Sequence, residues 1–268
     1  MHVPSASIIL ILFDMLLGLA VPIVLAAFFR KKYGAALVPF FIGMAVMVLF
    51  ALTLEQIVHS VVLGAPLGGT ILNNPYLYGL YGGFMAGLFE EGGRFLAMRF
   101  LLKKQHANRS NALMYGAGHG GIEMALLLCF GMINNLVFAL AVNAGKLETL
   151  LAPLDEAARA SLLPGIEQLC TASPFVFLAS PLERFAALAA QLALSVIVWK
   201  AAAEKGKMGY LALAFVLHLL IDAVSGTLAQ LGVPVLAVEA VVYVMAAAVC
   251  VIAYRVRKTD DGCEREPA

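Results

Sequence analysis

The sequence predicts an all-α polytopic membrane protein, built as one transmembrane bundle of about seven spanning helices. Hydrophobic residues make up 62% of the chain and charged residues only 13%, about half the charged share of a typical soluble domain. The mean hydropathy is +0.91. Apolar runs of about 20 residues, the length that a spanning helix needs, recur along the chain. We therefore expect a single integral membrane domain over residues 1–268.

Seven apolar segments meet this length requirement. They cover residues 7–29, 35–56, 77–102, 111–141, 180–202, 208–230 and 234–254. The first segment has no basic residue before it and no small-residue cleavage site after a short apolar run, so we expect a span and not a cleaved signal peptide. The segment 142–179 is the one long connection, and its apolar residues recur at helical spacing. This pattern predicts an amphipathic helix on the outer membrane surface.

Basic residues are concentrated in alternate loops. They follow the first, third, fifth and seventh segments, at Arg30–Lys32, Lys103–Arg109, Lys200–Lys207 and Arg255–Lys258. Cytoplasmic loops carry an excess of lysine and arginine. The pattern therefore predicts an outer N-terminus and a cytoplasmic C-terminus. We expect a multi-pass protein of the cell membrane, which in a bacterium is the cytoplasmic membrane.

The overall charge and the cysteines exclude other classes of function. A net charge of +1 argues against a nucleic-acid partner. The four cysteines share no short spacing and indicate neither a disulfide framework nor a cysteine metal site. They are Cys129, Cys170, Cys250 and Cys263.

The third segment carries charges in its middle, within the letters "FEEGGRF". Each such charge costs about 2.5–3.5 kcal/mol on insertion scales, and intramembrane charge usually marks a functional site. Glu90 and Arg94 are four residues apart and share one helix face, and Glu91 reaches Arg94 at a spacing of three. Arg94 is therefore the expected counter-ion of at least one carboxylate. Gly83 and Gly87 extend this face and would let another helix approach closely.

The fourth and sixth segments carry matching polar residues. In "YGAGHGGIE", Tyr115, His119 and Glu123 are spaced by four, and four glycines surround the histidine. Glycine costs about 1 kcal/mol per helix position relative to alanine, so this cluster indicates close approach by a helix or a substrate. In "HLLID", His218 and Asp222 are again four apart.

The depths of the three clusters are compatible. At the helical rise, Glu90 lies roughly 20 Å from the cytoplasmic end of its segment, and His119 and His218 lie roughly 12–15 Å from theirs. We expect the three helices to bring these side chains into one layer, on the cytoplasmic side of the bilayer midplane. Glu55 and His59 are also four residues apart and lie near the outer end of their predicted segment, where an interfacial role is expected and an outer ion site is the alternative.

Residue chemistry favours hydrolysis. Glu90 could take a proton from water as general base, with His119 positioning that water. His218, oriented by Asp222, could donate to the oxyanion that forms on an attacked carbonyl. The same residue types would also satisfy zinc. A proton- or ion-coupled transporter, a bis-histidine haem protein and a non-catalytic relative are the other readings that the residue types leave open.

The motifs "EEGGR", "YGAGHGGIE" and "HLLID" resemble those of the YhfC family of membrane proteins. They are also similar to those of the CAAX-processing and bacteriocin-processing (CPBP) and PrsW-type intramembrane proteases. Tyr115 to His119 fits the aromatic-x-x-x-His motif, and His218 to Asp222 fits the His-x-x-x-Asn/Asp motif. Arg94 follows the second glutamate by three residues, which is closer to the PrsW spacing than to the CPBP spacing of four.

This resemblance implies a glutamic-type intramembrane peptidase, with the core catalytic helices at 77–230. It implies a peptide or membrane-anchored protein substrate in the lipid bilayer, and no obligatory metal or other cofactor. The residues it implicates are Glu90, Glu91, Arg94, His119, Glu123, His218 and Asp222. The sequence specifies neither a particular substrate nor an oligomeric state.

Overall fold

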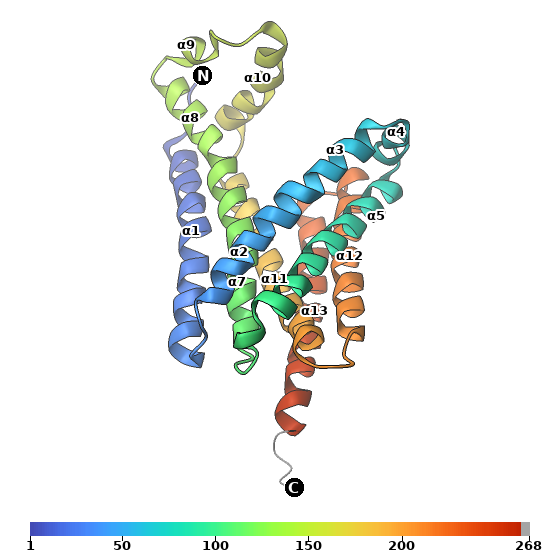
Figure 1. Ribbon diagram of the computed structural model, residues 1–268. Coiled ribbons are helices and arrows are strands. Elements are labelled where there is room, and N and C mark those ends of the chain that lie inside the picture. The colour runs from blue at the N-terminus through green and yellow to red at the C-terminus, as the bar shows by residue number, and fades with distance from the viewer. Residues whose placement is uncertain (264–268) are drawn as a thin grey trace. The chain divides into compact units, whose positions relative to one another are not determined.

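The computed structural model describes the fold of residues 1–263 and the side chains up to Lys258. The regular elements within this range are helices, and none of its residues forms a strand (Figure 1). This confirms the all-α prediction, which followed from apolar runs too long for strands.

Six helices in the described range are long and apolar enough to cross a membrane, which makes the chain a multi-pass membrane protein. They coincide with six of the seven predicted segments. These six are Ser5–Tyr33, Val38–Gly64, Asn111–Asn143, Pro174–Ala203, Gly209–Gln230 and Val235–Lys258. The second and third contain π-helical turns, in which the backbone hydrogen bonds span five residues instead of four.

The elements that build these six helices have the following bounds. They are α1 (Ser5–Tyr33), α2 (Val38–Val46), η1 (Met47–Glu55), α3 (Gln56–Gly64), α7 (Asn111–Ala125), η5 (Leu126–Phe130), α8 (Gly131–Asn143), η6 (Pro174–Leu178), α11 (Ala179–Ala203), α12 (Gly209–Gln230) and α13 (Val235–Cys263).

The third predicted segment, 77–102, is not among the six, although it is helical up to Leu101. It consists of α5 (Pro75–Ala86), η2 (Gly87–Glu91), α6 (Gly92–Leu96) and η3 (Ala97–Leu101). At 1.5 Å per residue this stretch is about 40 Å long, enough for a hydrocarbon core of about 30 Å. Its acidic and basic side chains set it apart from the six apolar helices, so its span, and with it the opposite placement of the two termini, stays a prediction.

The contacts divide the chain into two compact units. Unit 1 comprises Met1–Val21 and Glu123–Arg184, and unit 2 comprises Pro22–Ile122 and the residues from Phe185 onward. The expectation of a single domain stays a prediction.

In unit 1, the predicted amphipathic segment forms two helices, α9 (Leu147–Leu151) and α10 (Glu156–Thr171). Asp155 lies between them and caps α10, because its side chain accepts a hydrogen bond from the Ala158 N–H at 2.7 Å. Leu151 and Ile166 are buried in the apolar core of this unit. The apolar faces of α9 and α10 therefore pack against protein, and their place on the membrane surface stays a prediction.

In unit 2, α5 packs along α12 through glycines (Figure 1). A side chain at Gly83 would meet the backbone nitrogen of Ala223 at 2.8 Å, and a side chain at Gly79 would meet that of Thr227 at 2.9 Å. Real side chains do not tolerate such contacts, so only glycine permits this approach. The close approach predicted for Gly83 is therefore confirmed, and α12 is the helix that makes it.

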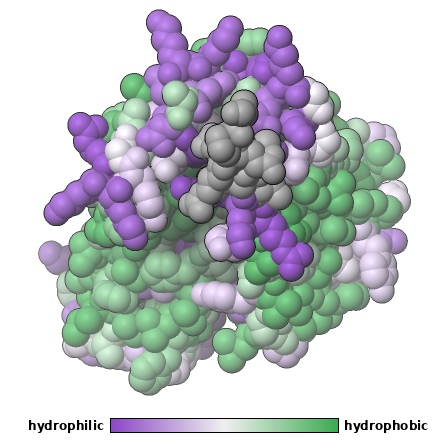
Figure 2. Space-filling model, turned by 90° about the horizontal axis from the view of Figure 1, so that it is seen from below, coloured by the Kyte–Doolittle hydropathy of each residue, from purple (hydrophilic) through white to green (hydrophobic). Residues whose placement is uncertain are grey.

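The four basic loops meet at one end of unit 2, the lower end in Figure 1. Asn108 Nδ2 donates to the Tyr33 carbonyl at 3.1 Å, and Arg99 Nη1 donates to the Ala202 carbonyl at 2.7 Å. The guanidinium of Arg257 lies 5.8 Å from the centre of the Tyr33 ring. Seen from below, hydrophilic side chains gather over part of this end, beside apolar surfaces (Figure 2). This clustering agrees with the charge pattern of the loops.

Candidate functional site

Two adjacent acids lie in the π-helical turn η2. Glu90 is 7% exposed and Glu91 only 1%. The turn packs against η1, a second π-helical stretch in unit 2. Single π turns inside longer helices are rare and are frequent at functional sites. The first of the three predicted clusters is therefore turned toward protein and away from lipid.

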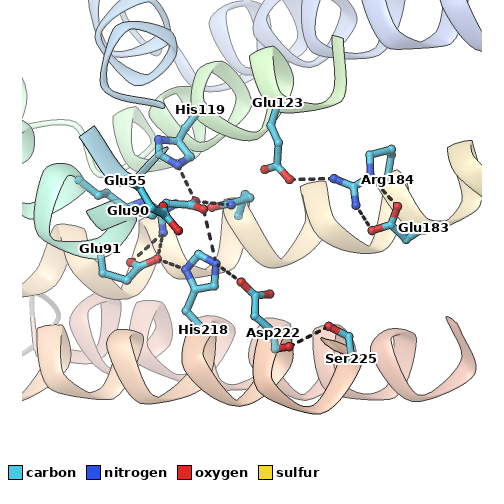
Figure 3. A network of polar contacts seen from close by, with 12 residues as sticks. Glu55, Glu90, Glu91, His119, Glu123, Glu183, Arg184, His218, Asp222 and Ser225 are labelled. Atoms are coloured by element: carbon cyan, nitrogen blue, oxygen red, sulfur yellow. Dashed lines mark hydrogen bonds and ion pairs between the residues drawn. The ribbon is translucent and has the colours of Figure 1, made fainter. Parts of the chain in front are cut away.

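Glu91 is held by two other charged or polar side chains (Figure 3). Arg94 Nη1 donates to both of its carboxylate oxygens, at 2.7 and 2.8 Å. His218 Nδ1 lies 2.7 Å from Oε1 of the same carboxylate. A buried carboxylate needs such a partner, so Arg94 is the counter-ion of Glu91, as their spacing of three residues predicts.

Glu90 is held by a histidine and an amide instead. His119 Nε2 lies 3.0 Å from Glu90 Oε2, and Gln191 Nε2 donates to the same oxygen at 2.8 Å. The carbonyl oxygen of Gln191 accepts a short hydrogen bond from Arg94 Nη2. Because the guanidinium only donates, it fixes the carbonyl of Gln191 toward itself and turns the amide N–H group toward Glu90.

Gln191 was not among the residues that the sequence indicated. It is a neutral residue of α11, within a predicted span dominated by alanine and leucine. The one available sequence signal was weak: Ser195 follows it at the helical spacing of four, and in the structure the Ser195 hydroxyl donates to the backbone carbonyl of Gln191.

His218 joins the two glutamates from α12. Its Nε2 lies 3.9 Å from Glu90 Oε1 and 3.5 Å from Asp222 Oδ2, while Nδ1 faces Glu91. The side chain of Asp222 is 38% exposed, whereas that of His218 is 6% exposed. The structure thus brings the three predicted clusters within hydrogen-bonding or water-bridging distance of one another (Figure 3).

The glycines around His119 let α7 approach two other helices. A side chain at Gly118 would meet the carbonyl carbon of Phe40 in α2 at 2.7 Å, and one at Gly116 would meet the Cα of Leu192 in α11 at 2.9 Å. Between these contacts His119 is fully buried. The glycine cluster therefore places the histidine between neighbouring helices, which was one of its two predicted uses.

Tyr115 stacks on His119 one turn away. The ring centres are 5.8 Å apart at an interplanar angle of 22°, and the tyrosine is fully buried. The Tyr115 hydroxyl and His119 Nδ1 have no hydrogen-bond partner among the described residues. Buried polar atoms of this kind usually bind ordered water or a ligand.

Glu123, the last predicted residue of the fourth segment, belongs to an ion pair in unit 1. Arg184 Nη1 donates to Glu123 Oε1 at 2.8 Å, and Arg184 also pairs with Glu183. The side chain of Glu123 is 17% exposed. A catalytic role for Glu123 stays a prediction.

Glu55 lies much closer to the site than its sequence position suggested. It is 6% exposed and interacts electrostatically with Glu90, His218 and Asp222. Figure 3 draws it beside Glu90. The helix that carries it continues to Gly64, past the predicted end at residue 56, so Glu55 lies farther from the helix end than predicted, and its interfacial role stays a prediction.

Glu55 begins a short chain of hydrogen bonds on α3 and α5. His59 Nε2 lies 3.1 Å from Glu55 Oε1, and His59 Nδ1 lies 2.9 Å from the Tyr81 hydroxyl. The side chain of His59 is 22% exposed. The pair that the sequence placed at an interface is therefore an extension of the buried polar cluster.

The residues do not form a ready metal site. Among the described residues, no group of three or more His, Cys, Asp or Glu side chains is arranged to hold a metal ion. One ring nitrogen of His119 and one of His218 already lie within hydrogen-bonding distance of a glutamate oxygen. Three cysteines, Cys129, Cys170 and Cys250, are free, and the side chain of Cys263 lies outside the described residues.

Comparison with known proteins agrees with the motifs. The family model "YhfC intramembrane metalloprotease" matches residues 17–246. The "Uncharacterized membrane protein YhfC" of Bacillus subtilis (strain 168) is 38% identical over 229 residues, which cover 84% of this chain and 87% of that protein. No solved structure gives a significant match. The chain belongs to the YhfC family, whose name indicates intramembrane protease activity.

Proposed function

We propose that this chain is an intramembrane peptidase of glutamic type, in which Glu90 activates water for attack on a peptide bond. The substrate is a membrane-embedded or membrane-adjacent peptide. The observation that carries the proposal is the position of Glu90, with one oxygen bound by His119 and the other facing His218 at 3.9 Å.

Glu90 is better suited than Glu91 to act as a general base. Both oxygens of Glu91 accept from the guanidinium of Arg94, and one also faces His218. One oxygen of Glu90 contacts His119 and Gln191, and the other faces His218 Nε2 at 3.9 Å. In this proposal Glu91 and Arg94 fix the ring of His218, and Gln191 and His119 fix Glu90.

The distance between Glu90 and His218 leaves room for one water. At 3.9 Å the two atoms are too far apart for a direct hydrogen bond. A single water can lie about 2.8 Å from both, because a polar gap above about 3.5 Å is commonly bridged by water. Such a water would be held by an acceptor and a ring nitrogen at the same time.

The proposed reaction proceeds in two steps. In the first, the water oxygen bonds to the peptide carbonyl carbon while its proton passes to Glu90, and the carbonyl oxygen becomes an oxyanion. His218, when both ring nitrogens carry protons, donates through Nε2 to that oxyanion and through Nδ1 to Glu91. In the second, the carbon–nitrogen bond breaks and Glu90 returns its proton to the leaving amine.

Asp222 has two parts in this scheme. It faces His218 Nε2 at 3.5 Å and stabilises the protonated ring. It is also the acid whose side chain is most exposed among the members of the network, at 38%. We infer that water and substrate reach Glu90 past Asp222.

The metalloprotease name of the family raises the question of zinc. A zinc ion would need three protein ligands and an open position, and no group of described residues offers that arrangement. No step of the proposed reaction is therefore assigned to a metal.

The proposal is tested by looking for new protein termini in membranes. Cells that produce the wild-type chain are compared with cells that produce Glu90→Gln, and the control is Asp14→Asn, which removes another fully buried acid, in α1. We expect termini that occur with the wild type and with Asp14→Asn and are lost with Glu90→Gln at equal protein amounts. Identical termini in all three strains would contradict the proposal.

A further inference from the structure

A polar cavity lies at the basic end of unit 2, apart from the glutamates and histidines of the candidate site. Its volume is about 270 Å³. Side chains from the loop before α7, from α11 and from α13 surround it. The polar and aromatic members are His106, Arg109, Trp199, Lys200, Glu204 and Arg257. The candidate peptidase site shares none of these residues.

The cavity has an excess of positive charge. Arg109, Lys200 and Arg257 face it from three different elements, against the single carboxylate of Glu204. Lys200 is only 7% exposed, and its ammonium group lies 5.3 Å from the centre of the Tyr210 ring. Lysine is rarely buried so completely, so Lys200 is held in the wall of the cavity.

Trp199 adds a hydrogen-bond donor to the same wall. The residue is 3% exposed, and its Nε1–H group has no hydrogen-bond partner among the described residues. The ring is fixed edge-to-face against His106, with the ring centres 5.3 Å apart. A buried donor without a partner is unfavourable and usually indicates an unseen acceptor.

The general preference for basic residues in cytoplasmic loops does not account for this arrangement. That preference is satisfied by side chains that point into water, as those of Lys103 and Arg255 do at the same end of the unit. Convergence of three cations and a buried N–H group on one small cavity is typical of a site for an anion with several oxygens.

We propose that this cavity binds a phosphate-bearing anion, either the headgroup of an anionic lipid or a soluble phosphate ester. Basic pockets between spanning helices on the cytoplasmic side commonly bind lipid headgroups of this kind. The phosphate oxygens would accept from Arg109, Arg257 and the Trp199 N–H, and Lys200 would contribute its charge. Binding would tie the ends of α11 and α13 to the loop before α7.

The chain provides its own reporter, because Trp199 is the only tryptophan in the sequence. The purified full-length chain in detergent is titrated with inorganic phosphate, with short-chain phosphatidylglycerol and with short-chain phosphatidylcholine while its fluorescence is recorded. We expect a saturating change with at least one of the first two probes. Phosphatidylcholine, whose net charge is zero, should give none.

Two variants separate the cavity from general charge. Arg257→Gln should weaken the response about tenfold or more, as expected for loss of a charge-assisted contact. Arg255→Gln removes an exposed charge from the same helix and should leave the response unchanged. For Trp199→Phe, which removes the N–H group and the reporter, the thermal stabilisation by the binding probe should be smaller than in the wild type.

Each outcome is decisive. A response to phosphatidylglycerol alone assigns the cavity to a lipid headgroup, and a response to inorganic phosphate assigns it to a soluble phosphate ester. The proposal is overturned by no response to either anion, by an equal response to phosphatidylcholine, or by equal weakening in Arg257→Gln and Arg255→Gln. Peptidase activity is not used in any of these measurements, so the result is independent of the proposed function.

Discussion

Gln191 offers the sharpest test of how the buried network is held together. Replacing it by leucine keeps a similar volume and removes both of its charged contacts, to Arg94 Nη2 and to Glu90 Oε2. A hydrogen bond to a charged group contributes about 1.5–3 kcal/mol. Loss of these two contacts within a buried network should therefore lower the free energy of unfolding by about 3–6 kcal/mol.

Gln191→Leu should also slow peptide cleavage, because Glu90 loses one of the two groups that position it. A displacement of a catalytic group by about 1 Å can cost about 100-fold in rate. The stability of the detergent-solubilised variant is measured by SDS-driven unfolding in mixed micelles. Its activity is measured as the rate at which a substrate identified from the terminus comparison is cut.

The matched control is Gln56→Leu. Gln56 is an exposed glutamine whose amide donates to the backbone carbonyl of Ala51 at 3.3 Å. That substitution should change the free energy of unfolding by no more than about 0.5 kcal/mol. If Gln191→Leu is as stable and as active as Gln56→Leu, the bridge from Arg94 to Glu90 does not hold the site, and the reasoning is refuted.

Three further predictions concern the close approach of α7 to α2, the interaction between Glu55 and Asp222, and the role of divalent metals. Gly118→Ala should destabilise the protein by about 1–3 kcal/mol through overpacking against Phe40. Gly131→Ala should not, because Gly131 has open space around it. Equal stability of the two variants would contradict the close approach of the helices. A double-mutant cycle with Glu55→Gln and Asp222→Asn, read by unfolding, should give a coupling of at least about 0.5 kcal/mol, and strict additivity would show that the two acids do not interact. Removal of divalent metals with a chelator should leave the cleavage rate unchanged, and a loss that added zinc restores would show that a metal takes part.

The convergence of the three polar clusters could be predicted because helical spacing and depth both constrain it. Glu90, His119 and His218 were expected in one layer, and the structure brings them together. The partner of Arg94 was only partly determined. Spacings of three and four both allow contact, and in the structure Arg94 Nη1 donates to Glu91 while Nη2 donates to Gln191.

Other features depend on properties that helical periodicity does not carry. Glu55 joins the cluster because its helix runs on to Gly64 and contains a long π-helical stretch. No local residue pattern predicts a π-helical stretch of this kind. Gln191 gave only a weak signal, because a single neutral amide in an apolar helix is more often structural.

The rate of cleavage by purified protein in proteoliposomes tests the central claim most directly. We predict that Glu90→Gln lowers this rate by at least about 100-fold, the contribution expected of a general base, and that His119→Ala lowers it as well, while both variants still insert into the membrane. Cleavage by Glu90→Gln within twofold of the wild-type rate would contradict the assignment of Glu90 as the group that activates water.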